Sequence, residues 1–213
     1  MAELFDELNE TNSRASSPRT GEGVVIDIGT GDGLFAYQSA KKNPRKFFIG
    51  IDPITRPLEK ISEKVHRRSA KGGLPNVLFL QASLEDLPEE LNGVADEVHV
   101  HFPWGSLLGA LARGDETLLG YIRRICASDA LLEVVIGLHP ERDRSEIARL
   151  GVTELSTEYI GSVLTRAYRR AGFEITEAGE RPPSDWVHLQ TTWSKRLAQN
   201  GGRLLTYLIA RAV

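Results

Sequence analysis

Cysteine is almost absent from this chain, in which Cys126 is the single example. A lone cysteine cannot form an intramolecular disulfide, which argues against a small secreted disulfide scaffold and for a reducing compartment. Uninterrupted apolar runs are short as well, and none approaches the ~20 residues of a membrane-spanning helix. The start of the chain is acidic and carries no export signal. We therefore expect a cytoplasmic protein without a membrane segment.

An overall excess of basic charge is also missing, because the formal net charge is −3. The charge is nevertheless segregated along the chain. Residues 41–71 carry ten Lys or Arg against three acids, and residues 193–213 carry four bases and no acid. Residues 84–98, in contrast, carry six acids and no base. Any one of these runs alone is more often a solvated helix face, but their segregation is compatible with docking on nucleic acid.

A glycine-rich turn follows the first strongly apolar segment. Residues 24–28 are mostly β-branched, Gly29, Gly31 and Gly33 alternate directly after them, and a helical pattern continues to about Lys42. This succession of strand, tight turn and helix is typical of the ligand-binding end of a βαβ unit. Glycine is needed in such a turn where φ is positive or where the backbone approaches a ligand closely.

The turn lacks the spacing of a dinucleotide fingerprint, whose third glycine would fall at Leu34. Asp27 precedes the first glycine by two residues, and a carboxylate there would repel a pyrophosphate. It can instead orient an ammonium group through bound water or the backbone. Asp52 ends the next apolar segment, about 20 residues past the turn, where a ribose diol is usually bound. The two acids together favour S-adenosylmethionine (SAM), whose amino-acid end is zwitterionic.

The remaining pattern predicts an α/β fold, a Rossmann-like seven-stranded sheet of the class I SAM-dependent methyltransferase type. We expect a flexible lead-in over 1–23 and a single domain over 24–213, with inserted excursions at about 139–156 and 180–202. Cys126 is expected to be buried at the end of a helix. The predicted strands are 24–28, 46–51, 77–80, 96–102, 131–138, 173–178 and 204–210, and the later helices are 55–68, 115–126 and 157–171.

The segment Phe102–Ser106 follows the fourth predicted strand, beside the first strand at the point where such sheets bind ligands. Enzymes that methylate an exocyclic amine often have Asn or Asp first in this position, and this chain has Phe102. The Phe102 side chain cannot accept a hydrogen bond from an amino group, which favours a ring nitrogen as the nucleophile. Because a ring nitrogen already has a free lone pair, no general base is expected. Trp104 and Trp193 are the candidates to stack on a base and to favour its growing positive charge. Core packing is the alternative for Trp104, and Trp186 is either a loop anchor or part of an RNA surface.

Four motifs in register resemble the aminoglycoside-resistance 16S rRNA (adenine(1408)-N1)-methyltransferases. The resemblance covers roughly residues 24–203, and its second and third motifs are the specific ones. The four motifs are Asp27-Ile28-Gly29-Thr30-Gly31-Asp32-Gly33, Lys71-Gly72-Gly73-Leu74-Pro75-Asn76, Phe102-Pro103-Trp104-Gly105-Ser106-Leu107-Leu108 and Trp193-Ser194-Lys195-Arg196-Leu197.

The resemblance implies that SAM lies over Gly29 and Gly31 with its ribose on Asp52. Trp104 and Trp193 would hold the flipped adenine between them, and the enzyme would act as a monomer on the decoding site of the 30S subunit. It implies no metal ligand. Ala82, Ser83 and Glu85 would surround the cofactor's adenine and Ser106 its methionine end, and Arg67, Arg68, Lys71, Arg149, Lys195, Arg196 and Arg203 would contact rRNA phosphates.

Two other functions remain compatible with the same sequence. A SAM-dependent small-molecule methyltransferase would use the two excursions as a lid and Trp104 to pack a ligand. A non-catalytic SAM- or RNA-binding protein would have kept the fold without the reaction. The segregated basic charge favours the rRNA enzyme over the small-molecule one.

Overall fold

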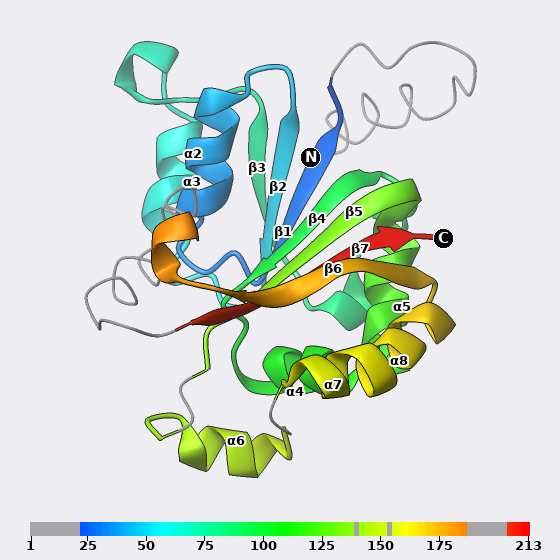
Figure 1. The fold of residues 1–213 in the computed structure, drawn as a ribbon. Helices are drawn as coiled ribbons and strands as arrows, with labels where there is room; N and C mark the ends of the chain where they lie inside the picture. Colours follow the sequence, from blue (N-terminus) through cyan, green and yellow to red (C-terminus); the bar gives the residue numbers. More distant parts are fainter. Residues whose placement is uncertain (1–21, 139–140, 153–154, 187–203) are drawn as a thin grey trace.

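The computed structural model describes residues 22–138, 141–152, 155–186 and 204–213. Seven strands form one sheet in the order β3-β2-β1-β4-β5-β7-β6, drawn in Figure 1. Strands β1 to β5 are parallel, and β7 is antiparallel to both β5 and β6. The sheet confirms the predicted fold class. The strands are β1 Val24–Ile28, β2 Phe47–Asp52, β3 Val77–Gln81, β4 Ala95–His101, β5 Cys126–Ile136, β6 Phe173–Arg181 and β7 Leu205–Ala212.

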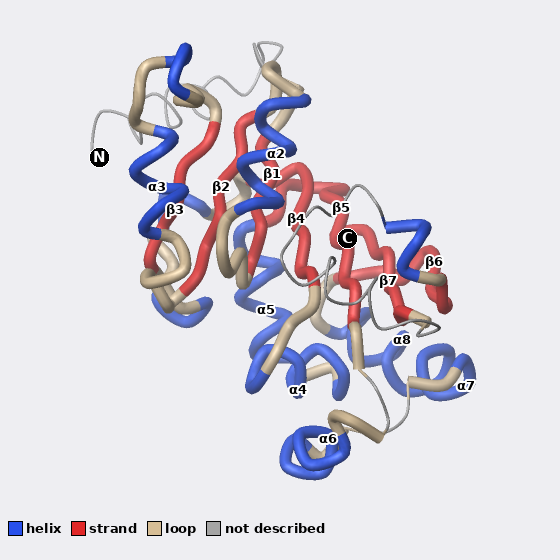
Figure 2. Tube along the Cα trace, turned by 90° about the vertical axis from the view of Figure 1, so that its left-hand side faces the viewer, coloured by secondary structure: helices blue, strands red, loops and turns tan. Residues whose placement is uncertain are grey.

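Helices cover both faces of this sheet, as Figures 1 and 2 show from two directions. On one face, α2 (Leu34–Lys42) and α3 (Glu59–Val65) pack over β1, β2 and β3. On the other face lie α4 (Gly105–Arg113), α5 (Glu116–Ile125) and α8 (Thr165–Arg170). Burial of both faces explains why β1 is apolar at every position except Asp27 instead of alternating. The remaining α-helices are α6 (Arg144–Leu150) and α7 (Thr157–Tyr159), and α7 continues through a π-helical turn (Ile160–Leu164) into α8.

Strand β4 differs from β1 because only one of its faces is apolar. Val98 and Val100 are fully buried against the α5 side. The alternating residues Glu97, His99 and His101 therefore point to the α2 side, since successive side chains of a strand leave on opposite faces. The sheet thus carries a polar row in its centre.

The structure differs from the predicted elements in two places. Helix α4 was not predicted, because Gly105 and Gly109 lower helix propensity, but full burial of Leu108 and Leu111 outweighs that cost. Cys126 begins β5 instead of ending a helix, and its Sγ donates to the Ile122 carbonyl at 3.2 Å. Cys126 is 3% exposed, so the expectation of a buried cysteine is confirmed, and burial raises the pKa of its thiol to about 12.

The bounds of other elements also shift. The predicted helix 55–68 shortens to α3, and β6 runs on to Arg181, so the second excursion begins later than expected. Most of that excursion and most of the predicted lead-in lie outside the described residues. Among the described residues, no helix combines the length and the apolar character that a bilayer crossing requires.

The loop after α3 contains a glycine that the packing requires. A Cβ at Gly73 would lie 1.6 Å from the carbonyl oxygen of Arg67. The neighbouring Gly72 has φ +89°, and its carbonyl accepts a hydrogen bond from the Tyr37 hydroxyl at 2.9 Å. The Lys-Gly-Gly-Leu motif is therefore a packing motif that attaches this loop to α2 and α3.

We predict that Gly73→Ala destabilises the fold by roughly 1–3 kcal/mol, because the added methyl group forces the backbone of Arg67 to move. Gly120→Ala is the matched control: it lies in α5 with nothing within 4 Å of the added Cβ, and it should stabilise by up to ~1 kcal/mol. Urea unfolding followed by circular dichroism measures both. Equal unfolding midpoints for the two variants would contradict the packing argument.

Candidate functional site

The turn after β1 is held in shape by the end of β2. The amides of Gly29 and Thr30 both donate to the Ile51 carbonyl, at 2.8 and 3.1 Å. Gly29, Gly31 and Gly33 have φ of +70°, +59° and +69°, the left-handed region that glycine enters without strain. The three alternating glycines thus curl the backbone over the carboxyl end of β1.

Asp52 ties this turn to the tip of β2. Its Oδ2 accepts from the Gly31 amide at 2.9 Å, and its Oδ1 accepts from the Ile54 amide at 2.8 Å. The residue remains partly exposed, and each carboxylate oxygen has a second lone pair. The two residues that were predicted to bind one cofactor are therefore brought into direct contact, with acceptor capacity left for hydroxyl groups.

Asp27 is buried beneath the turn. It is 3% exposed, and its Oδ2 accepts from the Thr30 hydroxyl at 2.5 Å. Burial raises the pKa of Asp27 to about 6, against the opposing effects of the Thr30 hydrogen bond and of His99 on the neighbouring strand. Asp27 consequently supports the shape of the turn from below, and any effect on an ammonium group would pass through the backbone or a bound water.

The segment after β3 lies next to the tip of β2, since Gln81 pairs with Asp52 in the sheet. Ala82 and Ser83 are partly exposed and Glu85 is exposed. The Ser83 hydroxyl donates to Asp86 at 3.2 Å and so shapes the turn of 3₁₀ helix at Leu84–Asp86. The predicted adenine-binding residues therefore share one edge of the sheet with the glycine turn.

The turn after β4 is strained and projects an indole ring outward. Phe102 has φ +53°, which costs an aromatic residue about 1–3 kcal/mol, and its amide donates to Val135 at 2.7 Å. Pro103 is buried, whereas Trp104 is 50% exposed and occupies the N-cap position of α4 without a capping hydrogen bond from its side chain. The core-packing alternative for Trp104 is therefore wrong.

The beginning of α4 lies against the glycine turn. A Cβ at Gly29 would lie 3.3 Å from a methyl group of Leu107, one residue after the exposed Ser106. Trp186, by contrast, is 6% exposed and packs on Tyr207 with ring centroids 5.7 Å apart. Trp186 is thus a buried anchor, and its interpretation as part of an RNA surface is wrong.

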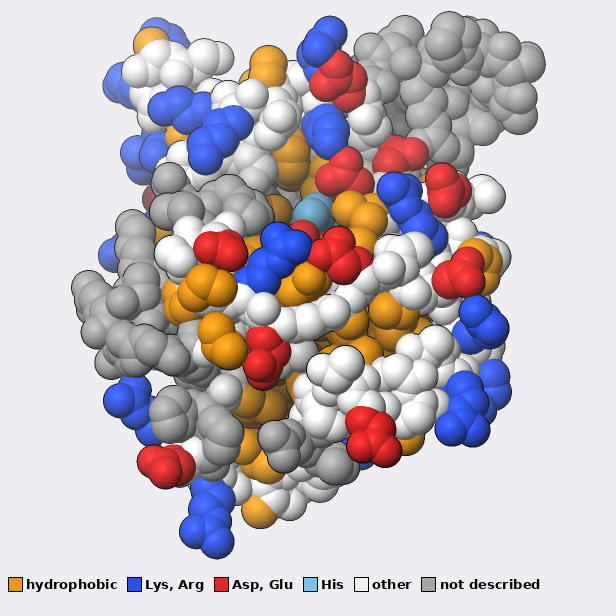
Figure 3. All heavy atoms as spheres, viewed as in Figure 1, with side chains coloured by type: hydrophobic (Ala, Val, Ile, Leu, Met, Phe, Trp, Pro, Cys, Tyr) orange, Lys and Arg blue, Asp and Glu red, His pale blue; other side chains and the backbone are white. Residues whose placement is uncertain are grey.

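The predicted RNA-binding residues are not gathered at this edge. Arg67, Arg68 and Lys71 are exposed at the opposite, amino-terminal edge of the sheet, in the connection that leads into β3. Figure 3 shows basic side chains gathered over α2 and α3. Arg149 lies on α6 and pairs with Glu146 at 2.7 Å. The predicted Trp193, Lys195, Arg196 and Arg203 lie outside the described residues.

Known proteins resemble this chain over nearly its whole length. The family model described as NpmA: 16S rRNA (adenine(1408)-N(1))-methyltransferase matches residues 7–212. An Escherichia coli protein of that name is 35% identical over 176 residues, 82% of this chain and 80% of its own length. One from Streptoalloteichus tenebrarius is 37% identical over 182 residues, 84% of this chain and 82% of its own.

Solved structures agree with these sequence matches. The aminoglycoside resistance methyltransferase NpmB1 has a TM-score of 0.80 at 43% identity, covering 97% of this chain and 93% of its own. The 16S rRNA methyltransferase KamB has a TM-score of 0.86 at 31% identity, covering 100% of this chain and 94% of its own. A tryptophan-to-alanine mutant of the 16S rRNA (adenine(1408)-N(1))-methyltransferase from Catenulisporales acidiphilia, solved with SAM, has a TM-score of 0.85 at 30% identity and covers 98% of this chain and 91% of its own.

The family expected from the sequence motifs is thus confirmed by a match that spans the described sheet and both sides of the glycine turn. This chain belongs to the NpmA family of 16S rRNA (adenine(1408)-N(1))-methyltransferases.

Proposed function

We propose that this protein transfers a methyl group from SAM to N1 of adenine 1408 in the 16S rRNA of the 30S subunit, and so confers aminoglycoside resistance. The observation that carries the proposal is the half-exposed Trp104 at the carboxyl edge of the sheet, next to the glycine turn. Membership of the NpmA family supports the target nucleotide. We further propose that the enzyme works as a monomer in the cytoplasm, with one methyltransferase domain over residues 24–213.

The residues at this edge fit SAM. Gly29 and Gly31 have no side chains that would obstruct a ligand, and as glycines they adopt the positive φ angles of the turn without strain. Asp52 offers carboxylate oxygens to the ribose hydroxyls, and Ala82, Ser83 and Glu85 lie on the adjoining segment for the adenine. SAM supplies an electrophilic methyl group on a sulfonium when it is bound. Ser106, at the first turn of α4, is our candidate for the methionine end.

The reaction needs positioning more than it needs proton transfer. N1 of adenine carries a free lone pair at neutral pH, so no side chain has to remove a proton before attack. Trp104, together with Trp193, stacks on the flipped base and offsets the cost of extruding it. The indole faces also stabilise the cationic product ring by ~1–2 kcal/mol in a desolvated site.

Docking on the subunit is assigned to the exposed basic residues. Arg67, Arg68 and Lys71 lie at the far edge of the sheet, about 17 Å from the turns for a strand of five residues. That separation suits a large, structured RNA whose phosphates are contacted at several places while one base is extruded. The remaining candidates are Arg149, Lys195, Arg196 and Arg203.

Primer extension on isolated 30S subunits tests the function. With purified protein and SAM, reverse transcription should stop at adenine 1408, because a methyl group on N1 blocks the Watson–Crick edge. Calorimetry of SAM binding to the free protein is the companion measurement. If SAM binds but no RNA is modified, the protein is a small-molecule methyltransferase or a non-catalytic binder and the proposal is wrong.

We predict that Trp104→Ala reduces kcat/KM for 30S methylation by roughly 10- to 100-fold, the loss of one base–aromatic stack. Trp193→Ala should have a similar effect. SAM affinity should stay nearly unchanged in both variants, and Trp104→Phe should restore most of the activity because a smaller ring still stacks. Full turnover by Trp104→Ala would rule out the stacking role.

We predict that Asp52→Asn weakens SAM binding by about tenfold or more, because an amide cannot accept from both Gly31 and Ile54 and from the ribose as well. Calorimetry with SAM measures the effect. Asp129→Asn is the matched control, since it makes the same chemical change on an exposed residue at the opposite end of the sheet. Equal SAM affinity in the two variants would remove Asp52 from the cofactor site.

A further inference from the structure

Two histidines and a glutamate meet on the polar face of the central strands, on the strands next to Asp27 and β1. His99 and His101 leave the same face of β4, and Glu133 is the β5 residue directly paired with His99. Glu133 Oε1 lies 3.0 Å from His99 Nδ1 and 2.7 Å from His101 Nε2. One nitrogen from each histidine and one carboxylate oxygen all lie within 4.8 Å of one another.

This group is held in place by a second layer of charged residues. His99 Nε2 lies 3.4 Å from Glu97 Oε2, and the other oxygen of Glu97 accepts from Lys46 at 2.6 Å. Burial raises the pKa of Glu133, but its hydrogen bonds with His101 and His99 outweigh burial and hold that pKa well below its usual range. On the other side of β4, Asp27 is the β1 residue that lies beside His99 in the sheet. Three acids and one lysine thus surround the two imidazoles.

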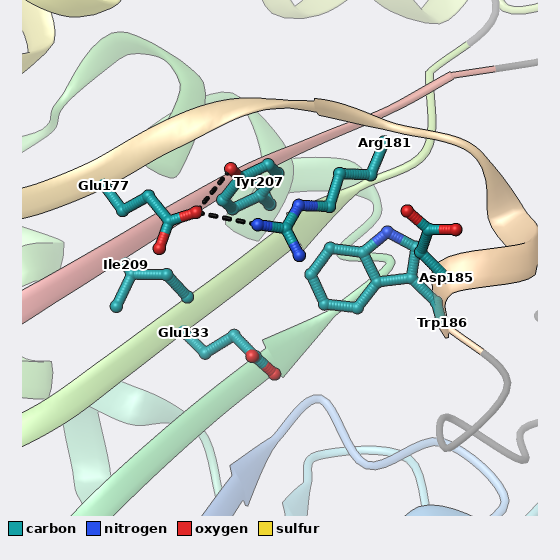
Figure 4. A pocket seen from close by; sticks show the side chains of 7 residues that line it. All are labelled: Glu133, Glu177, Arg181, Asp185, Trp186, Tyr207 and Ile209. Carbon is teal, nitrogen blue, oxygen red and sulfur yellow. Dashed lines mark hydrogen bonds and ion pairs between the residues drawn. The ribbon is translucent and has the colours of Figure 1, made fainter.

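A cavity of about 170 Å³ opens next to the group and has Glu133 in its wall. Figure 4 shows Glu133 below Glu177 and Arg181, with Trp186 beside them. Glu177 is already engaged by Tyr207 at 2.7 Å and by Arg181 at 2.9 Å. Of the acids that line this cavity, Glu133 is the one that contacts the two histidines. Water in the cavity can therefore reach the Glu133 carboxylate.

We propose that His99 Nδ1, His101 Nε2 and the Glu133 carboxylate bind one divalent transition-metal ion of the Zn²⁺ class. Two imidazoles and one carboxylate are a common ligand set for Zn²⁺, with water from the cavity as the fourth ligand. Tetrahedral bonds of ~2.0 Å place ligand atoms ~3.3 Å apart. The two histidine nitrogens would each move slightly away from Glu133 Oε1, and they would settle at the same separation from each other, starting from within 4.8 Å.

The surrounding contacts match the outer shell of a metal site. A metal-bound histidine usually donates its other ring nitrogen to a carboxylate, which fixes the ring and its tautomer. Glu97 fills that role for His99, and Lys46 holds Glu97. The ion would replace the protons now shared between Glu133 and the histidines. It would join β4 to β5 one residue before Phe102, and so stiffen the strand end that leads to Trp104.

Zinc calorimetry on the full-length, tag-free, chelator-treated protein tests the site. One Zn²⁺ should bind per chain, and saturating Zn²⁺ should raise Tm by roughly 5 °C or more, reversibly with chelator. Co²⁺ should give the visible absorption of a tetrahedral site and should be displaced by Zn²⁺. Glu133→Gln and His101→Gln should each weaken Zn²⁺ binding at least tenfold, whereas the exposed control His66→Ala should not.

Nitrogen NMR of the wild-type imidazoles gives a readout that does not depend on any variant folding. Zn²⁺ should shift the ring nitrogens of His99 and His101 and leave His66, His139 and His188 unchanged. Absence of a shift, or a shift confined to the last three, overturns the proposal, as does undiminished Zn²⁺ affinity in a folded Glu133→Gln. None of these measurements involves methyl transfer, so they stand or fall separately from the proposed function.

Discussion

The hydrogen bond between the Gly31 amide and the Asp52 carboxylate joins the two strand ends on which the proposed cofactor site depends. It works together with the Ile51 carbonyl, which accepts from the amides of Gly29 and Thr30. One short stretch of β2 therefore sets the shape of the turn after β1. Because parallel strands end at one edge of the sheet, the segments after β3 and β4 are brought to the same place.

The strained turn at Phe102 is the second determinant of the site. A left-handed backbone at an aromatic residue persists only where the surrounding structure enforces it, and here a hydrogen bond to Val135 and the buried Pro103 do so. After this turn, Trp104 lies exposed at the start of α4. The strained backbone at Phe102 thus accompanies an exposed aromatic face at Trp104, the face that we propose stacks on the base.

The polar row on β4 shows a different use of the same sheet. Val98 and Val100 face the apolar core while His99 and His101 face Glu133 on β5. The alternation of a strand allows one segment to build a dry core on one side and an ionic network on the other. His101 of this network is the last residue before Phe102, so the network borders the turn that carries Trp104.

Much of this protein follows from local sequence. The β-branched run before Gly29, the acid at Asp52 and the segment Phe102–Ser106 predicted the strands, the turn and the edge where they meet, because strand and turn preferences act over a few residues. Helix α4 escaped prediction, since burial of Leu108 and Leu111 overrides the glycines around them. The depth of Trp186, the position of Arg67 at the far edge and the pairing of His99 with Glu133 were decided only by the tertiary structure. These last features depend on sheet register and on which face a strand turns to a helix, and both are set by contacts between residues far apart in the chain.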